Sequence, residues 1–169
     1  MSLCIGLFGT CGNTTFRQDL FVPTYEQNDM AYYNPQVEDW TPECAVEEAN
    51  HLANDEILLF PITRETYGSG SLSEIGFSVL NAIKLDSRRD MVVMIDQELN
   101  EDLIETNVIA AKESLRARAL VREHLKKLNY PNIYMVDDLE TMLDLSMQLY
   151  ISRVVMEEFR KYSLKEMAK

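Results

Sequence analysis

Short apolar runs alternate with longer amphipathic stretches along the chain. Five of these runs predict strands, at residues 3–8, 31–37, 55–63, 91–95 and 132–136. The third run is continuously apolar in its centre, which is typical of a parallel strand that is buried on both faces. The second run is aromatic and favours a strand as well, although Pro35 weakens its end.

Helical signals fill the segments between the runs. Thr41 and Pro42 provide a cap and a first-turn proline for a helix that extends to about residue 53. Another helix follows the third strand and ends near residue 85. The region 101–128 is helical and long enough to contain a break.

The two ends of the chain also predict helices. A short helix follows the polar loop 9–15, extends to about Phe21 and is ended by Pro23. In residues 139–162 apolar side chains recur at helical spacing, which predicts a long C-terminal helix. Its apolar face is wide, so we expect it to pack on the sheet and on another subunit of a homo-oligomer.

Strands that alternate with helices predict an α/β fold with a parallel sheet and right-handed crossovers. Five strands in one domain, residues 1–169, favour a flavodoxin-like three-layer sandwich with strand order 2-1-3-4-5. In that order the loops after the first and third strands flank the point where the strand order reverses. The two small-residue loops of the chain, 9–15 and 68–71, are these loops.

Charge and cysteine content narrow the classes of partner. The net charge of −12 argues against a nucleic-acid polymer, because phosphate contacts need clustered lysine and arginine. No apolar run has the length of a membrane span, and no signal peptide is evident at the N-terminus. The three cysteines have no disulfide-framework spacing, so we expect reduced thiols and a cytoplasmic protein.

The sequence lacks the residue patterns of several kinds of catalytic and cofactor-binding site. The two histidines, His51 and His124, lie in predicted helices without metal-ligand spacing to cysteine or aspartate, so the sequence predicts no metal and no cofactor. The chain has no phosphate-binding lysine motif and no GxGxxG fingerprint. Without a suitably placed histidine, serine hydrolysis and a Cys11 nucleophile are both disfavoured.

Carboxylates remain as candidate catalytic groups, and the most informative one lies in the segment 68–76. Glu74 follows a small-residue loop after a buried strand, where ligands bind in open α/β sheets. One interpretation makes it a catalytic carboxylate that a helix N-terminus holds ionised. The other makes Ser71 and Glu74 a capping box, in which the glutamate only bonds back to the serine backbone.

The motifs of the first half of the chain, taken in order, resemble the nucleoside 2-deoxyribosyltransferase-like family. The similar segments are Gly-Leu-Phe-Gly-Thr at 6–10, Tyr-Asn-Pro-Gln-Val-Glu-Asp-Trp-Thr-Pro-Glu-Cys at 33–44, 55–63, and Ser-Leu-Ser-Glu-Ile-Gly at 71–76. The resemblance implies an enzyme that cleaves or transfers the N-glycosidic bond of a nucleoside. It implies that Glu74 attacks C1′ of the sugar and that an acid on the preceding helix handles the proton of the base. Glu47 matches that acid best, and Glu48 is the neighbouring option.

The expected pocket and its alternatives complete the sequence-based hypothesis. We expect Gly9, Thr10, Asp39 and Trp40 to line the pocket, since they follow the first and second strands on the ligand side. A family acid just upstream of the glutamate motif has no clear counterpart at Thr66-Tyr67-Gly68, which leaves room for another substrate.

The first alternative is hydrolysis of a nucleoside 5′-monophosphate. Ser69, Ser71 and Arg17 would then hold the phosphate. The second alternative is a catalytically silent module that binds a nucleotide or signals through it.

Overall fold

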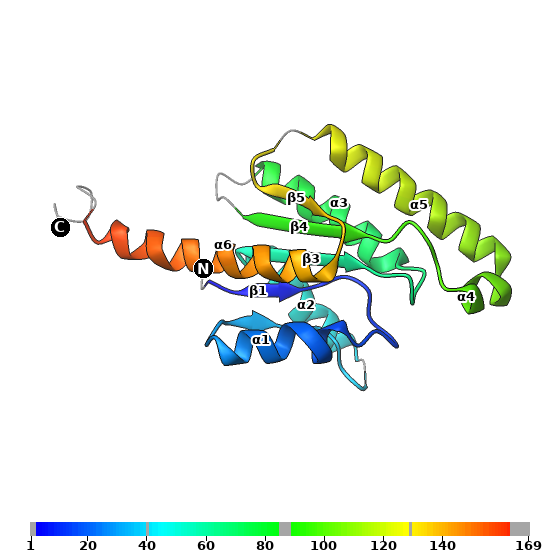
Figure 1. Ribbon diagram of the computed structural model, residues 1–169, viewed down its shortest axis with the longest axis horizontal. Coiled ribbons are helices and arrows are strands. Elements are labelled where there is room, and N and C mark those ends of the chain that lie inside the picture. The colour runs from blue at the N-terminus through cyan, green and yellow to red at the C-terminus, as the bar shows by residue number, and fades with distance from the viewer. Residues whose placement is uncertain (1–2, 40, 85–88, 129, 163–169) are drawn as a thin grey trace.

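The computed structural model describes residues 3–39, 41–84, 89–128 and 130–162 (Figure 1). Its sheet has five strands, and all neighbouring pairs are parallel. The order is β2-β1-β3-β4-β5, so the predicted flavodoxin-like order 2-1-3-4-5 is confirmed. The strands are β1 (Ile5–Leu7), β2 (Tyr32–Tyr33), β3 (Ile57–Ile62), β4 (Asp90–Ile95) and β5 (Ile133–Val136).

Helices cover both faces of this sheet, as a three-layer sandwich requires (Figure 1). The helices α1 (Val22–Gln27) and α6 (Leu139–Arg160) pack on one face. The helices α2 (Pro42–Asn54), α3 (Ser69–Lys84) and α5 (Val108–Lys127) pack on the other. Two short elements, the π-helical turn η1 (Arg17–Phe21) and α4 (Glu101–Thr106), precede α1 and α5.

The buried central strands supply alternate side chains to the two layers. In β3, Ile57 and Leu59 face α1 and α6, whereas Leu58 and Phe60 face α2, α3 and α5. This is the two-residue period of a strand whose faces are both covered. The uninterrupted apolar run in the sequence is the result, because neither face of β3 meets water.

Pro23 does not end the first helix, contrary to the prediction. The chain passes from η1 directly into α1, with Pro23 in the first turn of α1. A proline is tolerated there because first-turn N–H groups have no partner inside the helix. The prediction also missed the wider π-helical turn, which changes the hydrogen-bond register before the proline.

The long helical region 101–128 is broken at Asn107. This residue has an extended backbone, and its side chain accepts a 3.0 Å hydrogen bond from the backbone N–H of Ala110. It therefore ends α4 and caps α5.

In the C-terminal helix α6, the last turns extend beyond the sheet (Figure 1).

Candidate functional site

The carboxyl ends of β1 and β3 meet where the strand order reverses. Hydrogen bonds and close backbone packing join the loop after β1 to the end of β3. Gly9 has a φ of 93°, and a Cβ at this position would lie 2.5 Å from the carbonyl oxygen of Pro61. The hydroxyl of Thr10 donates to the same carbonyl over 3.1 Å and lies 2.8 Å from the hydroxyl of Thr63. Thr10 is only 1% exposed. The structure therefore places both predicted pocket residues, Gly9 and Thr10, in a backbone junction between the two loops.

Arg17 lies beneath the first of these loops with no exposed surface. Its guanidinium group donates three hydrogen bonds, to the carbonyl oxygens of Leu7, Phe8 and Thr10, over 3.0, 2.8 and 2.7 Å respectively. Among the described residues, no carboxylate forms a salt bridge with it. Its positive charge acts on the site through the electrostatic field and partly offsets the rise that burial causes in the pKa values of Glu48 and Glu74.

Helix α3 begins at Ser69, earlier than the capping-box interpretation requires. Gly68 has a φ of 66°, and its carbonyl oxygen accepts a 2.9 Å hydrogen bond from the backbone N–H of Leu72. Glu74 therefore lies in the second turn of α3, and the first turn contains no acid. Ser71 is a buried residue inside the helix, so Ser71 and Glu74 do not form a capping box. The expectation that the helix N-terminus holds Glu74 ionised is also wrong, because that effect fades after the first turn.

Glu74 instead has an environment that favours its protonated form. Burial raises its pKa to about 7, the negative charge of Glu48 adds to the rise, and Arg17 opposes it. Burial also raises the pKa of Glu48. Burial and the charge of Glu48 together therefore favour a proton on Glu74.

The structure separates the two candidate acids of α2. Glu47 is exposed, whereas Glu48 is half-buried and interacts with Glu74 and Arg17. Consecutive helical residues point about 100° apart, so only one of two neighbours faces the sheet edge. Glu48 is the residue that does so here.

A cleft of about 640 Å³ opens beside Glu48, between the loops that follow β1 and β2. Gln36 crosses this region, donating from its amide to the carbonyl oxygens of Gly12 and Thr14 over 3.0 and 3.3 Å. Glu74 does not line the cleft, but it interacts electrostatically with Glu48 and Cys11, which do. The lining residues are Cys11, Gly12, Asn13, Gln18, Pro35, Gln36, Val37, Glu38 and Glu48.

None of the remaining predicted pocket residues that the structure describes is part of this lining. Asp39 is exposed and is not part of its lining, and Ser69 is exposed at the first position of α3. Trp40 lies outside the described residues. Sequence reasoning missed Gln18 and Gln36, although both are polar residues next to predicted loops of the ligand side. Only the tertiary structure brings them together, through a 3.1 Å hydrogen bond between their amides.

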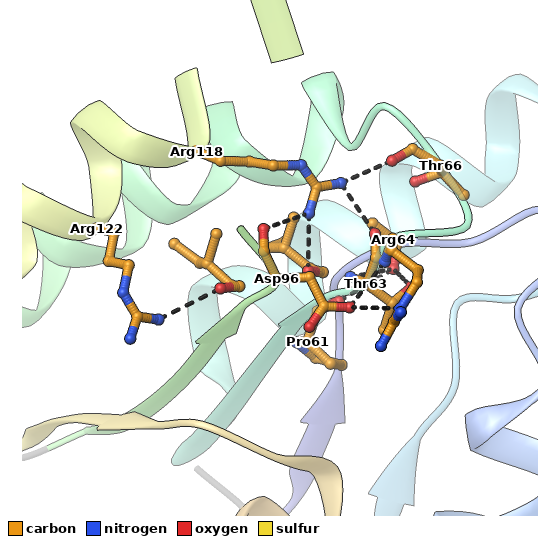
Figure 2. Close-up of polar contacts among 10 residues, drawn as sticks. Pro61, Thr63, Arg64, Thr66, Asp96, Arg118 and Arg122 are labelled. Atoms are coloured by element: carbon orange, nitrogen blue, oxygen red, sulfur yellow. Dashed lines mark hydrogen bonds and ion pairs between the residues drawn. The ribbon is translucent and has the colours of Figure 1, made fainter. Parts of the chain in front are cut away.

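A second buried arginine, Arg118 of α5, fixes the loop that leads into α3 (Figure 2). Its five N–H groups are all used: four bonds of 2.7–3.0 Å reach carbonyl oxygens, and one of 3.2 Å reaches the hydroxyl of Ser114. The carbonyl groups belong to Ile62, Asp96, Thr63 and Thr66. Arg118 thereby ties the ends of β3 and β4 to the loop that carries the chain to Glu74.

A different polar cluster lies at the amino ends of the strands. It consists of Cys4, His51 and Asp55, whose ligand atoms all lie within 4.8 Å of one another. Burial and the charge of Asp55 raise the pKa of the Cys4 thiol to about 12, which makes it a poor nucleophile. No sequence pattern connects these residues, because Cys4 is remote from the other two along the chain.

Neither the protein-family models nor the curated proteins with which the chain was compared match it. Among the described residues, no helix is both long and apolar enough to cross a membrane.

Proposed function

We propose that this protein cleaves or transfers the N-glycosidic bond of a nucleoside or deoxynucleoside, with Glu48 and Glu74 as the reacting carboxyl groups. The observation that carries the proposal is the electrostatic coupling of these two carboxyl groups beside a cleft, with the buried charge of Arg17 nearby. Paired carboxyl groups, one ionised and one protonated, suit glycosidic bonds because one attacks the sugar while the other protonates the leaving group. The structure thus favours Glu48 over Glu47 as the partner of Glu74.

The proposed reaction has two steps. In the first, Glu48 takes the proton of Glu74, and the resulting Glu74 carboxylate forms a bond to C1′ while the bond between C1′ and the base nitrogen breaks. The base leaves with the electron pair of that bond and takes the proton from Glu48. In the second, Glu48 removes a proton from a second base or from water, which attacks C1′ and releases Glu74. The assignment of Glu74 as nucleophile rests on the resemblance of residues 71–76 to the nucleoside 2-deoxyribosyltransferase-like family.

Turnover and trapping test the proposal together. Glu74→Gln keeps the shape of the side chain and is expected to lower base release from deoxynucleosides by roughly 10³-fold or more. Glu48→Ala is expected to let the glycosyl ester accumulate, and peptide mass spectrometry would then find the sugar on Glu74. Base release at the native rate by Glu74→Gln would refute the proposal, and an ester found on Glu48 in Glu74→Gln would exchange the two roles.

A nucleoside 5′-monophosphate is the second candidate substrate, with hydrolysis in place of transfer. The exposed Ser69 at the start of α3, together with the N–H groups of the first helical turn, supports it. Assays with and without an acceptor base distinguish a transferase, which makes a new nucleoside, from a hydrolase, which releases free sugar. Saturable nucleotide binding without base release would identify a catalytically silent module.

We also propose that the enzyme is a cytoplasmic homo-oligomer. Its cysteines are free, which suits a reducing compartment. The last turns of α6 expose several large apolar side chains that a second copy would cover: Ile151, Val154, Val155, Met156 and Phe159. Light scattering on native protein and on Phe159→Glu tests this, because the variant is expected to have the lower mass.

A further inference from the structure

Three potential metal ligands converge at the amino ends of β1 and β3, away from the proposed active site. Cys4 directly precedes β1, His51 lies in the last turn of α2, and Asp55 caps that helix. The Nδ1 atom of His51 lies 3.0 and 3.1 Å from the two carboxylate oxygens of Asp55. The sulfur of Cys4 lies within 4.8 Å of both partners' ligand atoms. Two segments, the start of β1 and the end of α2, thus bring a sulfur, a nitrogen and an oxygen donor to one point.

The surrounding structure holds these donors in place. The ring of Tyr33 stacks on the ring of His51, with 3.7 Å between the centroids and 5° between the planes. The carboxylate of Asp55 is packed against Gly6, where a Cβ would lie 2.9 Å from Oδ2. The backbone of Asp55 is fixed as well, since its N–H donates to the carbonyl oxygen of His51 over 2.8 Å. Little rearrangement is therefore needed for the three donors to share one ion.

We propose that Cys4, His51 and Asp55 bind a divalent transition-metal ion, with Zn²⁺ the ion that best fits this donor set. Thiolate, imidazole and carboxylate are the protein ligands of zinc, and three of them leave a fourth position for water. On binding, the proton of the thiol passes to solvent and a sulfur–metal bond forms. The thiolate and the carboxylate together then balance the charge of the ion.

Access and charge define the kind of site. Cys4 and Asp55 are buried, but the side chain of His51 is 32% exposed, which gives an ion a route from solvent. Arg89 lies beside Asp55, donating to its backbone carbonyl oxygen over 2.7 Å, and its positive charge opposes a second cation. We therefore expect weaker binding than in a structural site with four protein ligands.

The ion would join the start of β1, the end of α2 and the start of β3. Because it binds the folded protein, it would raise the thermal midpoint of unfolding in a concentration-dependent way. This effect does not depend on the proposed catalytic activity, since Glu48 and Glu74 take no part in the site.

Cobalt titration of the 169-residue chain tests the proposal. The protein is first treated with a chelator and then titrated with Co²⁺, whose thiolate complexes have an ultraviolet charge-transfer band and visible bands that report coordination geometry. We expect both signals to saturate at one ion per chain, Zn²⁺ to displace them, and Zn²⁺ to raise the melting temperature.

Matched variants separate this site from adventitious binding. Cys4→Ser should abolish the charge-transfer band, and His51→Gln should weaken binding at least tenfold. Cys44→Ser and His124→Gln, which change a cysteine of α2 and the other histidine of the chain, should leave the titration unchanged. His51→Gln keeps the test decisive if Cys4→Ser fails to fold, because His51 is only partly buried.

The proposal is overturned if the native protein develops no thiolate–cobalt band. It is also overturned if the band survives Cys4→Ser and is lost in Cys44→Ser. In the first case the three side chains form a hydrogen-bonded polar cluster and nothing more.

Discussion

At the residue scale, the most informative group is the carboxyl of Glu74. It is partly buried in the second turn of α3, where neither the helix N-terminus nor a capping hydrogen bond stabilises its charge. Burial and Glu48 therefore raise its pKa to about 7. Shifts of this size by burial and a like charge are typical of functional carboxyl groups.

Removing a negative charge from α2 tests the electrostatic coupling of Glu48 and Glu74 directly. In Glu48→Gln the negative charge that raises the pKa of Glu74 is gone, so this pKa should fall toward its ordinary value. Glu47→Gln removes the same charge from an exposed neighbouring position and should leave the pKa of Glu74 unchanged. Carbon-13 NMR titration of the glutamate carboxyl groups measures both variants. Equal shifts in the two variants would contradict the assignment of Glu48 as the partner.

The same residue links stability to pH. The folded pKa of about 7 lies above the ordinary value of 4.5, so between these values the folded state holds a proton that the unfolded state releases. The carboxyl group therefore lowers stability as pH rises through this range. Glu74→Gln should raise the free energy of unfolding at about pH 8 by on the order of 1 kcal/mol, a figure reduced for solvent screening of a partly exposed group. Urea unfolding at about pH 4 should show no gain, since both states are then largely protonated.

At the element scale, the loops after β1 and β3 act as one unit. Gly9 and Thr10 of the first loop contact Pro61 and Thr63 at the end of β3. The glycine is required for close approach and for a positive φ, so it does not serve to open the loop to a ligand. The junction thus holds the loop after β1, which lines the cleft, against the end of β3.

Substitution of the junction glycine tests this role. Gly9→Ala brings a methyl group against the Pro61 carbonyl and retains a φ of 93°, so we expect a loss of about 2–4 kcal/mol in unfolding free energy. Gly76→Ala, in the interior of α3 with no atom within 4 Å of the new Cβ, should instead gain about 0.5–1 kcal/mol. Chemical denaturation of both variants gives the comparison, and a Gly9→Ala protein of native stability would refute the junction.

At the scale of the whole molecule, buried arginines join the layers. The three largest fully buried side chains are Arg17, Arg89 and Arg118, and each donates to backbone carbonyl groups. They satisfy carbonyl oxygens at strand ends and at a helix end, where the regular ladders stop. The guanidinium group suits this task because its N–H groups diverge in one plane.

Arg118 offers the clearest test of this arrangement. Arg118→Met keeps much of the apolar stem but removes the guanidinium donor from four carbonyl oxygens, of which that of Ile62 still accepts from the backbone N–H of Asp96. It should therefore lower the unfolding free energy by about 3 kcal/mol or more. Arg116→Met, at an exposed position of the same helix, should change it by no more than about 0.5 kcal/mol. Urea unfolding measures both, and similar values for the two variants would contradict the role of Arg118.

The sequence by itself determined the layers and the order of the sheet. Alternation of apolar strands with amphipathic helices is a local pattern, and β3 shows its cause, since burial on both faces forces a continuous apolar run. The same pattern also predicted the position of the candidate site, because the strand order determines the point at which that order reverses, between β1 and β3.

Only the tertiary structure decided which side chains meet there. It selected Glu48 over Glu47, moved Glu74 out of the first helical turn, and turned Arg17 inward to backbone carbonyls. It also joined Cys4 to His51 and Asp55. These outcomes depend on helix phase, on the exact start of a helix and on contacts between distant segments. A local pattern of residues fixes none of the three, because each is set by how the elements pack.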